Sequence, residues 1–519
     1  MDIHELRAEV RRVVNDPTLT YQQRRHRLAG LAEEALEYPP LSDAAREALD
    51  KRIVCDMFEG PAPYRPRYVL PDYERAVHQG SAFLELEAPR DLDEALAFLL
   101  MLYSQVPSIT GYPVYVGDLD KVLAPFVNGV SDDDLYRKLR LLWLSLDRMF
   151  PDAFLHTDFG PDDSRVTRTI LRLERELQQV VPNCTMKVDP DRTPDDLVLD
   201  GVRTVFACGQ PHFVNHPMMV ADHGEGYAAV SCYNSLKIGG GSHTLVRLNL
   251  KEVVLRHTGD LESFFGSTLP TYVELTAEVI EARVRHLVEE ARFFEHSWLV
   301  HEGLVDLSRF SAMFGIFGLA EAVDLLMERD GREGTYGHSS EADALSYRLT
   351  QTVADLVAVR PMPYCDGGGG RCYLHSQSGI DSDVGVTAGT RIPVGAEPGL
   401  YEHLRTVAPH HRLFASGVSD VLSMDDTATR NPQAMVDIIR GALREGMRDV
   451  TFNLDSNEFV RVTGYLVRKS DLARAAEGTR HGSDQLAAGA EANTHMTQRA
   501  VKRVISQEMA ATDPRRVGG

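Results

Sequence analysis

The sequence predicts an α/β protein in which helices cover a mostly parallel sheet. Two observations favour this class. From about residue 180 onward, short strand-like segments alternate with helical ones, and the strand-like segment Val450–Leu454 directly follows the helical segment Asn431–Met447. Strands that alternate with helices usually pair in parallel and need helices packed on their faces. The part of the chain before residue 180 is predicted to be mainly helical.

Helical spacing is clearest at the start of the chain. Ile3, Leu6, Val10 and Val13 fall on one helical face, so the first sixty residues are predicted to form a helical arm. A connector rich in Pro and Tyr, residues 61–71, ends this pattern. Further helices are predicted at Leu92–Ser104, from the N-cap Ser131 onward, from Thr193-Pro194-Asp195-Asp196 onward, and at Tyr272–Phe294, Arg309–Arg329 and Glu341–Val359.

Two strands flank a glycine-rich turn in the middle of the chain. Tyr227–Ser231 is predicted to be a short strand, and His243–Leu250 alternates polar and apolar residues as a half-buried strand does. Cys232 lies between the first of these strands and the turn Gly239–Gly241. A loop in this position can project a side chain out of a sheet.

Composition narrows the possible partners and the compartment. The chain has 519 residues and a formal net charge of −21, which argues against nucleic acid or an anionic membrane as its main partner. The first residues lack the apolar stretch of a signal peptide, and the longest apolar run, Ala95–Tyr103, is too short to span a bilayer. The six cysteines are expected to be reduced thiols, and the protein is expected to be cytoplasmic.

The segment Arg461-Val462-Thr463-Gly464-Tyr465, near the C-terminus, suggests radical chemistry. A stable backbone radical requires glycine, because without a Cβ the α-carbon can become planar and share its electron with both adjacent amides. A simpler interpretation is a turn that uses the positive φ available to glycine. For an isolated motif of this length, the simpler interpretation is at least as good.

This motif and a second block of residues resemble the glycyl radical enzyme superfamily, which includes pyruvate formate-lyase and anaerobic ribonucleotide reductase. In that superfamily an extended segment, a Thr-Pro-acid-acid-Leu helix start and an aromatic-x-Asn segment precede the catalytic cysteine. The same order is present here, in the segments Cys184–Asp189, Thr193–Leu197, His212–Asn215 and Val230–Asn234, followed by Gly239–Gly241.

The resemblance implies a fold and a domain layout. The fold would be a ten-stranded barrel made of two five-stranded half-barrels, surrounded by helices. The helical arm would cover residues 1–60 and a single barrel domain residues 61–512, with a disordered tail at 513–519. Within the barrel domain, the cysteine loop would cover about 226–242 and the glycyl radical loop about 458–468.

The resemblance also implies roles for individual residues. Gly464 would store the radical, Cys232 would carry the working thiyl radical, and Arg461 and Tyr465 would support the radical loop. No cofactor would be bound permanently. The glycyl radical would be installed after translation by a radical S-adenosylmethionine activating enzyme, the expected protein partner, and a homodimer is compatible with the family.

Differences from the known branches of the superfamily narrow down which branch this chain resembles. Cys232 is flanked by Ser231 and Tyr233, whereas pyruvate formate-lyase has two adjacent cysteines. Dehydratases and related lyases carry a Glu base two positions after the cysteine, where this chain has Asn234, which cannot titrate. Only Cys365 and Cys372 lie in the region where the reductases have a four-cysteine zinc site, so no metal is expected. What remains most resembles the short YjjI-type proteins, also in residues 61–73, 239–250 and 388–398.

Residues around the cysteine loop are weaker candidates for substrate contact or proton transfer. Asn234, Tyr233, His243 and His216 are candidates for substrate binding. Each residue type is more often a satisfied structural residue than a catalytic one. Further acid–base candidates are Asp222, His223, Glu225, His375, Asp381 and Asp383.

The sequence therefore predicts an oxygen-sensitive enzyme that abstracts hydrogen from a small polar metabolite. Elimination, as in a lyase or dehydratase, is the default reaction, because most branches of the superfamily perform it. Two alternatives stay open. One is a different radical reaction, such as a reductase-like step or C–C bond cleavage, and the other is a non-catalytic barrel that serves as a binding scaffold.

Overall fold

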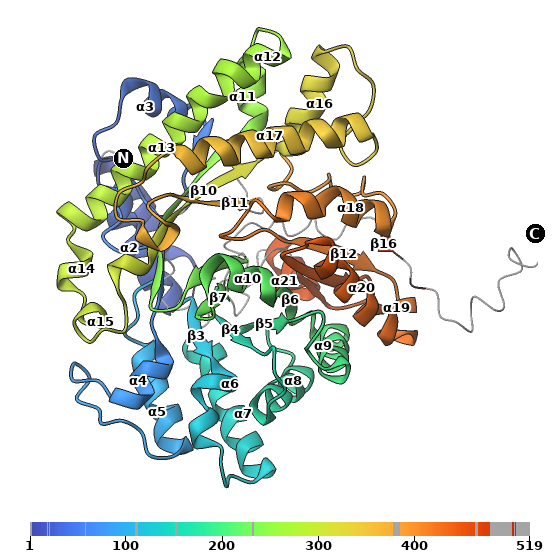
Figure 1. Ribbon diagram of the computed structural model, residues 1–519. Helices are drawn as coiled ribbons and strands as arrows, with labels where there is room; N and C mark the ends of the chain where they lie inside the picture. Colours follow the sequence, from blue (N-terminus) through green and yellow to red (C-terminus); the bar gives the residue numbers. More distant parts are fainter. Residues whose placement is uncertain are drawn as a thin grey trace, which may run out of the picture.

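The computed structural model describes residues 3–17, 19, 21–57, 59–108, 113–150, 154–230, 233–376, 385–461, 466–477, 501–502 and 504. Strands occupy the middle of the molecule, with helices on two sides (Figure 1). The long helices α13 (Leu269–Arg285) and α17 (Ser340–Val359) lie on one side, and α7 (Asp132–Met149) and α8 (Arg165–Leu177) on the other. The predicted α/β class is confirmed.

A seven-stranded sheet contains both parallel and antiparallel pairs. Its order is β16-β12-β13-β6-β5-β4-β3. Strands β3 to β6 pair in parallel, as do β13, β12 and β16, and β13 meets β6 in antiparallel orientation. The strands are β3 (Tyr115–Asp118), β4 (His156–Phe159), β5 (Asn183–Val188), β6 (His212–Asn215), β12 (Asp420–Met424), β13 (Asp449–Leu454) and β16 (Val501–Lys502).

A five-stranded sheet is built around β9. Strands β9, β10 and β11 pair in parallel, while β1 and β2 pair with β9 in antiparallel orientation. A Cβ at Gly241 would lie 2.0 Å from the carbonyl oxygen of Tyr68, so glycine is required at this position of β9, where β2 pairs with it. The strands are β1 (Val54–Cys55), β2 (Tyr68–Leu70), β9 (Gly240–Asn249), β10 (Phe310–Phe317) and β11 (Tyr373–Ser376).

Two short hairpins complete the strand inventory of the described residues. β7 (Tyr227–Val230) pairs with β8 (Asn234–Lys237), and we call this pair the cysteine hairpin. β14 (Phe459–Arg461) pairs with β15 (Leu466–Arg468), and we call this pair the glycine hairpin. In the described part of the chain, the pairings give two large sheets and these two hairpins, and they do not close a barrel. The ten-stranded barrel stays a prediction.

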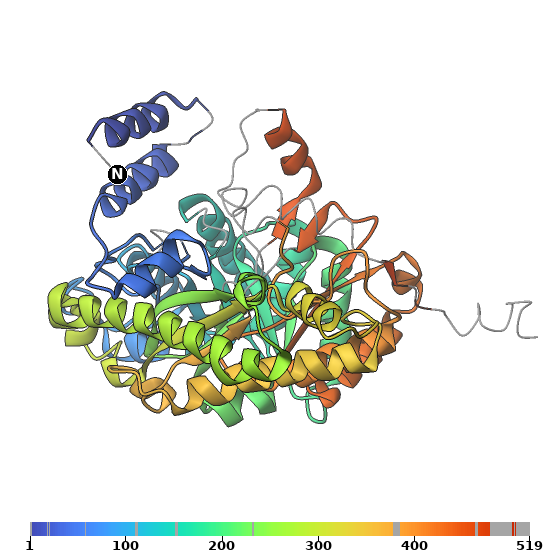
Figure 2. The ribbon, with the colours of Figure 1, turned by 90° about the horizontal axis from the view of Figure 1, so that it is seen from above.

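The helices form three groups along the chain. The first two form an arm with a small core of its own, which stands away from the body in Figure 2. They are α1 (Ile3–Asn15) and α2 (Tyr21–Glu34), followed by α3 (Asp43–Asp50), α4 (Tyr73–Gln79), α5 (Leu92–Tyr103) and α6 (Leu119–Val122). Around and after the cysteine hairpin come α9 (Asp195–Cys208), α10 (His216–His223), α11 (Leu250–Arg256), α14 (Phe293–His296), α15 (Trp298–His301) and α16 (Leu319–Arg329). The C-terminal helices are α18 (Leu400–His411), α19 (Thr427–Arg430), α20 (Pro432–Glu445) and α21 (Lys469–Ala476).

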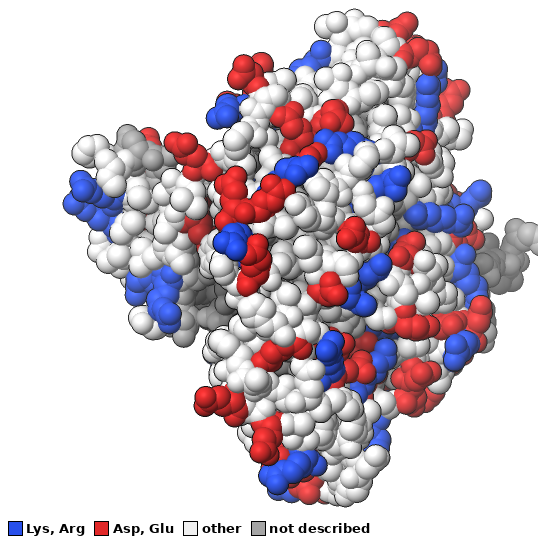
Figure 3. Space-filling view, turned by 60° about the vertical axis from the view of Figure 1, so that its left-hand side comes forward, with Lys and Arg blue, Asp and Glu red and all other residues white. Residues whose placement is uncertain are grey.

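The end of the predicted arm contacts the rest of the molecule. Its last residues form β1, which pairs with β9 of the five-stranded sheet, and α3 packs close to α13. The exact boundary at residue 60 stays a prediction. None of the described helices is long and apolar enough to cross a membrane. On the face shown in Figure 3, acidic and basic side chains are interspersed.

One prediction of secondary structure is wrong and several are confirmed. The segment Arg309–Arg329 was expected to be one helix, but its first part is the strand β10 and only Leu319–Arg329 is helical. Every residue of β10 is buried, so the strand lacks the polar alternation that marks a half-buried strand. The predicted helix Tyr272–Phe294 is interrupted by a π-helical turn at His286–Glu290. The predicted helices within 92–104, 341–359 and 431–447 and the strands at 243–250 and 450–454 are confirmed.

Candidate functional site

Strand β5 presents a polar face to the cysteine hairpin. Alternate residues of β5 are apolar and join the main hydrophobic core, whereas the residues between them are polar and fully buried. Because successive side chains of a strand point to opposite faces, β5 separates an apolar helix-covered face from a polar one. The apolar residues are Cys184, Met186 and Val188, and the polar ones are Asn183, Thr185 and Lys187.

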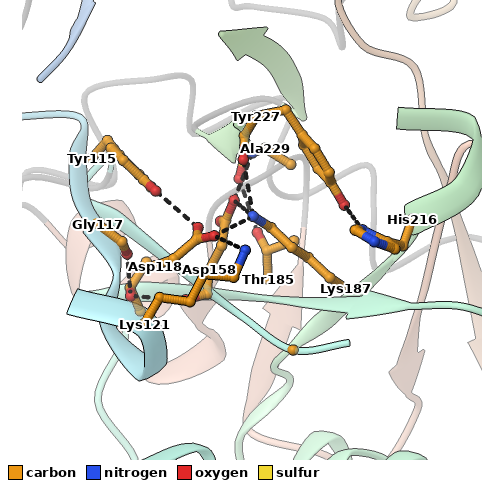
Figure 4. A network of polar contacts seen from close by, with 12 residues as sticks. Tyr115, Gly117, Asp118, Lys121, Asp158, Thr185, Lys187, His216, Tyr227 and Ala229 are labelled. Carbon is orange, nitrogen blue, oxygen red and sulfur yellow. Dashed lines mark hydrogen bonds and ion pairs between the residues drawn. The ribbon is translucent and has the colours of Figure 1, made fainter. Parts of the chain in front are cut away.

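The polar face holds the backbone of β7 through a buried ionic network, which we call the base clamp (Figure 4). Lys187 Nζ lies 2.6 Å from Asp118 Oδ2 and donates to the Tyr227 carbonyl at 2.9 Å. The Ala229 N–H donates to Asp158 Oδ2 at 2.7 Å. These groups come from β3, β4 and β5, so three strands of the sheet fix the hairpin.

Burial and nearby charges shift the pKa values of the two carboxyl groups of the base clamp in opposite directions. Burial raises the pKa of Asp158 to about 8, and Lys187, 3.8 Å away, only partly opposes this effect. Burial also acts to raise the pKa of Asp118, but the nearby Lys187 and Lys121 ammonium groups outweigh it and hold that pKa below its usual value. Near neutral pH, Asp118 is therefore the charged partner of Lys187, and Asp158 holds a proton.

The tip of the cysteine hairpin is held in an unusual backbone conformation. Tyr233 has φ of 61° and is 3% exposed, and its ring meets the His212 ring edge-on with the centroids 5.0 Å apart. A bulky residue at positive φ costs about 1–3 kcal/mol and persists only where its surroundings hold it. Gly417 packs so closely that a Cβ there would lie 2.0 Å from the Tyr233 carbonyl oxygen.

His212 lies at the centre of a second buried polar group. Its Nδ1 lies 2.5 Å from Asp449 Oδ2, and its Nε2 lies 2.7 Å from Thr185 Oγ1. Burial lowers the pKa of His212, the Asp449 carboxylate opposes this shift, and the Arg461 guanidinium adds to it. His212 therefore has a neighbour on each hairpin, Tyr233 on one and Arg461 on the other.

The glycine hairpin is fixed mainly through its backbone. The side chain of Asn453 accepts from the Arg461 N–H at 2.7 Å and donates to the Arg461 carbonyl at 2.9 Å. Arg461 Nε donates to the Gly209 carbonyl at 3.2 Å. Burial lowers the pKa of Arg461, and within the described part of the chain its two terminal nitrogens have no hydrogen-bond partner.

The residues expected to carry the radical are not among those described. Cys232, Gly464 and Tyr465 lie outside the described residues. Their flanking residues, Tyr233 and Arg461, are described and lie within electrostatic range of each other, since the Arg461 charge counteracts the burial that raises the pKa of Tyr233. Tyr233 and Arg461 thus lie near the same buried polar group.

The other candidates for substrate contact are spread over the molecule. Asn234 is fully buried beside the tip and donates to Tyr68 Oη and the Val230 carbonyl, while its Oδ1 has no partner among the described residues. His216 lies at the base of the hairpin, where Nδ1 is 3.0 Å from the Tyr227 hydroxyl. His243 packs between Phe294 and Phe310 and contacts the Tyr364 carbonyl, with its pKa lowered by burial to about 4.

The acid–base candidates have mainly structural contacts. Asp222 pairs with the buried Arg448, and Glu225 is exposed. His223 contacts the Ala415 carbonyl at 2.8 Å, and burial lowers its pKa to about 4. His375 lies 3.1 Å from the Ser416 carbonyl. Asp381 and Asp383 lie outside the described residues.

The two cysteines considered for a zinc site are buried thiols. Burial raises the pKa of Cys365 well above its usual value and that of Cys372 to about 12. Across the described ranges, no group of three or more His, Cys, Asp or Glu side chains could hold a metal ion.

Sequence reasoning missed the residues that organise this site. The sequence motifs contain His212 only within the segment His212–Asn215, and they do not single out Asp449, Asp158 or Lys187. A signal was present in residues 183–188, where polar and apolar residues alternate strictly. The alternation predicts a strand with one polar face, but only the fold shows that this face is buried against another part of the chain.

Comparisons with known proteins identify the family of this chain. A family model described as "Glycyl radical enzyme YjjI-like" matches residues 19–502. The YjjI protein of Escherichia coli K12 is 48% identical over 506 residues, covering 97% of each chain, and a Haemophilus influenzae protein is 36% identical over 466 residues, covering 89% of this chain and 90% of its own.

Solved structures share the fold at low sequence identity. Hydroxyproline dehydratase from Clostridioides difficile has a TM-score of 0.69 at 11% identity, covering 96% of this chain and 88% of its own. The B12-independent glycerol dehydratase from Clostridium butyricum has a TM-score of 0.68 at 11% identity, covering 89% of this chain and 83% of its own. An anaerobic ribonucleotide reductase has a TM-score of 0.66 at 14% identity, covering 93% of this chain and 86% of its own. With the family model matching nearly the whole chain, this protein belongs to the YjjI-like family of glycyl radical enzymes.

Proposed function

We propose that this protein uses a radical stored at Gly464 to generate a thiyl radical at Cys232. The observation that carries the proposal is that Tyr233 contacts the His212 ring and that the Arg461 charge acts on the same histidine, because Tyr233 directly follows Cys232 and Arg461 precedes Gly464 by three residues. The Cys232 thiol gives its hydrogen atom to Gly464, and the resulting thiyl radical takes one from a substrate carbon. The product radical takes the hydrogen back from Cys232, so the cycle needs no external oxidant or reductant.

The proposed substrate is a small polar metabolite, and the proposed reaction is an elimination. The polar residues of β4, β5 and β6 support a polar substrate, since the interior near the hairpin tip carries hydrogen-bonding groups. The structural neighbours include two dehydratases, which favours elimination, and a reductase, which keeps a reductase-like reaction as the alternative. Asn234 can orient a substrate but cannot supply the base.

The remaining parts of the proposal follow from the family. The barrel is proposed to close as two five-stranded half-barrels, with Arg461 and Tyr465 supporting the radical loop. A radical S-adenosylmethionine activating enzyme is proposed to remove the hydrogen from Gly464 in the cytoplasm under anaerobic conditions. No cofactor held permanently by this chain is required, because the radical resides on its own backbone.

Electron paramagnetic resonance tests the proposal without a known substrate. The protein is co-expressed anaerobically with its candidate activating enzyme, and we expect a glycyl signal that is absent in Gly464→Ala. Exposure to oxygen should cut the wild-type chain at residue 464, as mass spectrometry would show. A silent protein beside a demonstrably active activating enzyme would favour the scaffold alternative.

The role of Cys232 is tested by hydrogen exchange. The one hydrogen left on the radical carbon splits the glycyl signal into a doublet, and exchange through the Cys232 thiol in D2O replaces it with deuterium and collapses the doublet. We expect the collapse in the wild type and a persistent doublet in Cys232→Ser. Collapse at the wild-type rate in Cys232→Ser would remove Cys232 from the mechanism. A substrate screen with the activated enzyme then distinguishes elimination from other reactions by their products.

A further inference from the structure

A hydrogen-bonded chain contacts the cysteine hairpin just before Cys232. Thr185 Oγ1 donates to the Ala229 carbonyl at 2.9 Å and lies 2.7 Å from His212 Nε2. His212 Nδ1 in turn lies 2.5 Å from Asp449 Oδ2. Ala229 precedes Cys232 by three residues. The chain therefore fixes the strand that leads into the cysteine.

The same chain contacts the hairpin again just after Cys232. Ser419 Oγ donates to Asp449 Oδ1 at 2.6 Å, and the Ser419 hydroxyl also hydrogen-bonds the side chain of Tyr233. Tyr233 is the residue that follows Cys232. Ala229 and Tyr233, which lie on either side of Cys232 in the sequence, are thus both anchored by one continuous polar chain.

The chain uses both ring nitrogens of its histidine. Thr185 Oγ1 lies 2.7 Å from His212 Nε2, and His212 Nδ1 lies 2.5 Å from Asp449 Oδ2. A planar ring held at both nitrogens has a narrow range of favourable geometries, so His212 is a rigid link between Thr185 and Asp449.

Burial makes this geometry hard to leave. All four members of the chain are buried, the most exposed being Ser419 at 4%. A buried polar group that loses its partner has no water to replace it, so each member holds the next in place. The left-handed backbone of Tyr233 needs such support, because nothing within the residue itself favours it.

We propose that Thr185, His212, Asp449 and Ser419 form a positioning device for Cys232, which we call the tip clamp. The tip clamp fixes the residues on both sides of the cysteine and so holds the thiol at the distance from Gly464 that hydrogen-atom transfer requires. The inference rests on the proposed function of Cys232 and Gly464 and adds to it the residues that set their approach. These residues act through the hairpin and need not touch the substrate.

The test measures how fast the glycyl doublet collapses in D2O, at equal radical content. Thr185→Val and Ser419→Ala each remove one hydroxyl with little change of shape, and Thr185→Ser and Ser419→Thr are their matched controls that keep it. A displacement of about 1 Å costs a reaction about 100-fold. We therefore expect Thr185→Val and Ser419→Ala to slow the collapse about 10- to 100-fold, while both controls keep the wild-type rate.

Two further variants separate positioning from a loss of stability. His212→Phe keeps a planar ring but removes both hydrogen bonds, and should slow the collapse at least as much as the hydroxyl variants. His257→Gln alters another buried histidine with two close contacts, Thr268 Oγ1 and the Asp260 carbonyl, and should leave the rate unchanged. If His212→Phe does not fold, the two hydroxyl pairs still decide the question.

Failure of this inference differs from failure of the proposed function. Suppose that the glycyl doublet collapses in the wild type and persists in Cys232→Ser. If it then collapses at the wild-type rate in Thr185→Val and Ser419→Ala, the tip clamp has no positioning role. If radical-bearing wild type shows no collapse at all, the proposed approach of Cys232 to Gly464 is itself wrong, and the positioning role falls with it. A lowered melting temperature with an unchanged collapse rate would also overturn the inference.

Discussion

The cysteine hairpin and the glycine hairpin are similar in size but are held by different kinds of contact. Buried charged and polar side chains from β4 and β5 hydrogen-bond to the backbone of the cysteine hairpin, and a carboxylate from β3 pairs with one of them. The glycine hairpin is held by the neutral side chain of Asn453, by exposed contacts such as Arg468 to the Gln178 carbonyl, by Phe459 and Leu466 in the main core, and by a small separate core. That core consists of Val421, Val460 and Val467.

This difference indicates unequal freedom to open. Releasing the cysteine hairpin would break the hydrogen bond from the Lys187 ammonium group to the Tyr227 carbonyl, and a hydrogen bond to a charged group contributes about 1.5–3 kcal/mol. Releasing the glycine hairpin would break the neutral hydrogen bonds of Asn453 and would let water reach the terminal nitrogens of Arg461, which have no hydrogen-bond partner among the described residues. Local opening free energies follow such differences. We therefore expect the described strands of the glycine hairpin to open more readily than those of the cysteine hairpin.

The largest expected effect comes from breaking the base clamp. Lys187→Met leaves Asp118 without its main partner in a fully buried position and should lower the free energy of unfolding by about 3–5 kcal/mol. Urea unfolding followed by circular dichroism measures this. Lys121→Met removes a partly exposed partner of the same carboxylate and should cost less than about 1 kcal/mol. Equal losses in the two variants would contradict the importance of burial.

A matched pair of glycine substitutions compares the hairpins directly. In Gly417→Ala the new Cβ meets the Tyr233 carbonyl oxygen at 2.0 Å and φ is +130°, so we expect a loss of about 3 kcal/mol. In Gly209→Ala it meets the end of the Leu466 side chain at 2.9 Å and φ is +74°, and a loss of about 1–2 kcal/mol is expected. Thermal unfolding of both proteins measures the order. The reverse order would mean that the tip of the cysteine hairpin adapts easily.

Amide hydrogen exchange should separate the hairpins without any mutation. We expect the described amides of β14 and β15 to exchange at least about tenfold faster than those of β7 and β8, a difference of about 1.4 kcal/mol in opening free energy. Mass spectrometry of peptides that cover 459–468 and 227–237 measures both in one sample. Equal protection would show that the neutral contacts hold as firmly as the buried charges.

The smallest effect at neutral pH is expected for Asp158→Asn. Burial raises the pKa of Asp158 to about 8, and the unfolded value is about 3.9. The folded chain therefore binds more protons than the unfolded chain between about pH 4 and 8, and stability falls as pH rises through this window. The asparagine resembles the protonated acid, so at pH 7 the change should stay within about 1 kcal/mol.

The same variant should change the pH dependence of stability. A single group contributes a slope of up to about 1.4 kcal/mol per pH unit, and Asp158→Asn should remove it. Urea unfolding between pH 5 and pH 8 measures the slope. Asp93→Asn alters an exposed carboxylate and is the control, with the wild-type slope expected. An unchanged slope in Asp158→Asn would mean that this carboxyl group is ionised in the folded protein.

Local sequence was sufficient for the features that depend on neighbours along the chain. The helix start at Ser131 was predictable, because capping side chains act within three residues, and the Ser131 side chain caps the helix as expected. The order of motifs around Cys232 and Gly464 identified the family, which the comparisons confirm. The strand β10 was missed because a strand buried on both faces has no periodicity of its own.

The sequence by itself therefore determined the α/β class, the family and the pair of residues proposed to carry the radical. The tertiary structure decided which polar residues support them. His212 and Asp449 are 237 positions apart and meet only because β13 pairs with β6. Lys187 would be an ordinary solvated lysine in another setting. It becomes a buried anchor because the cysteine hairpin covers the polar face of β5, a contact that no local pattern encodes.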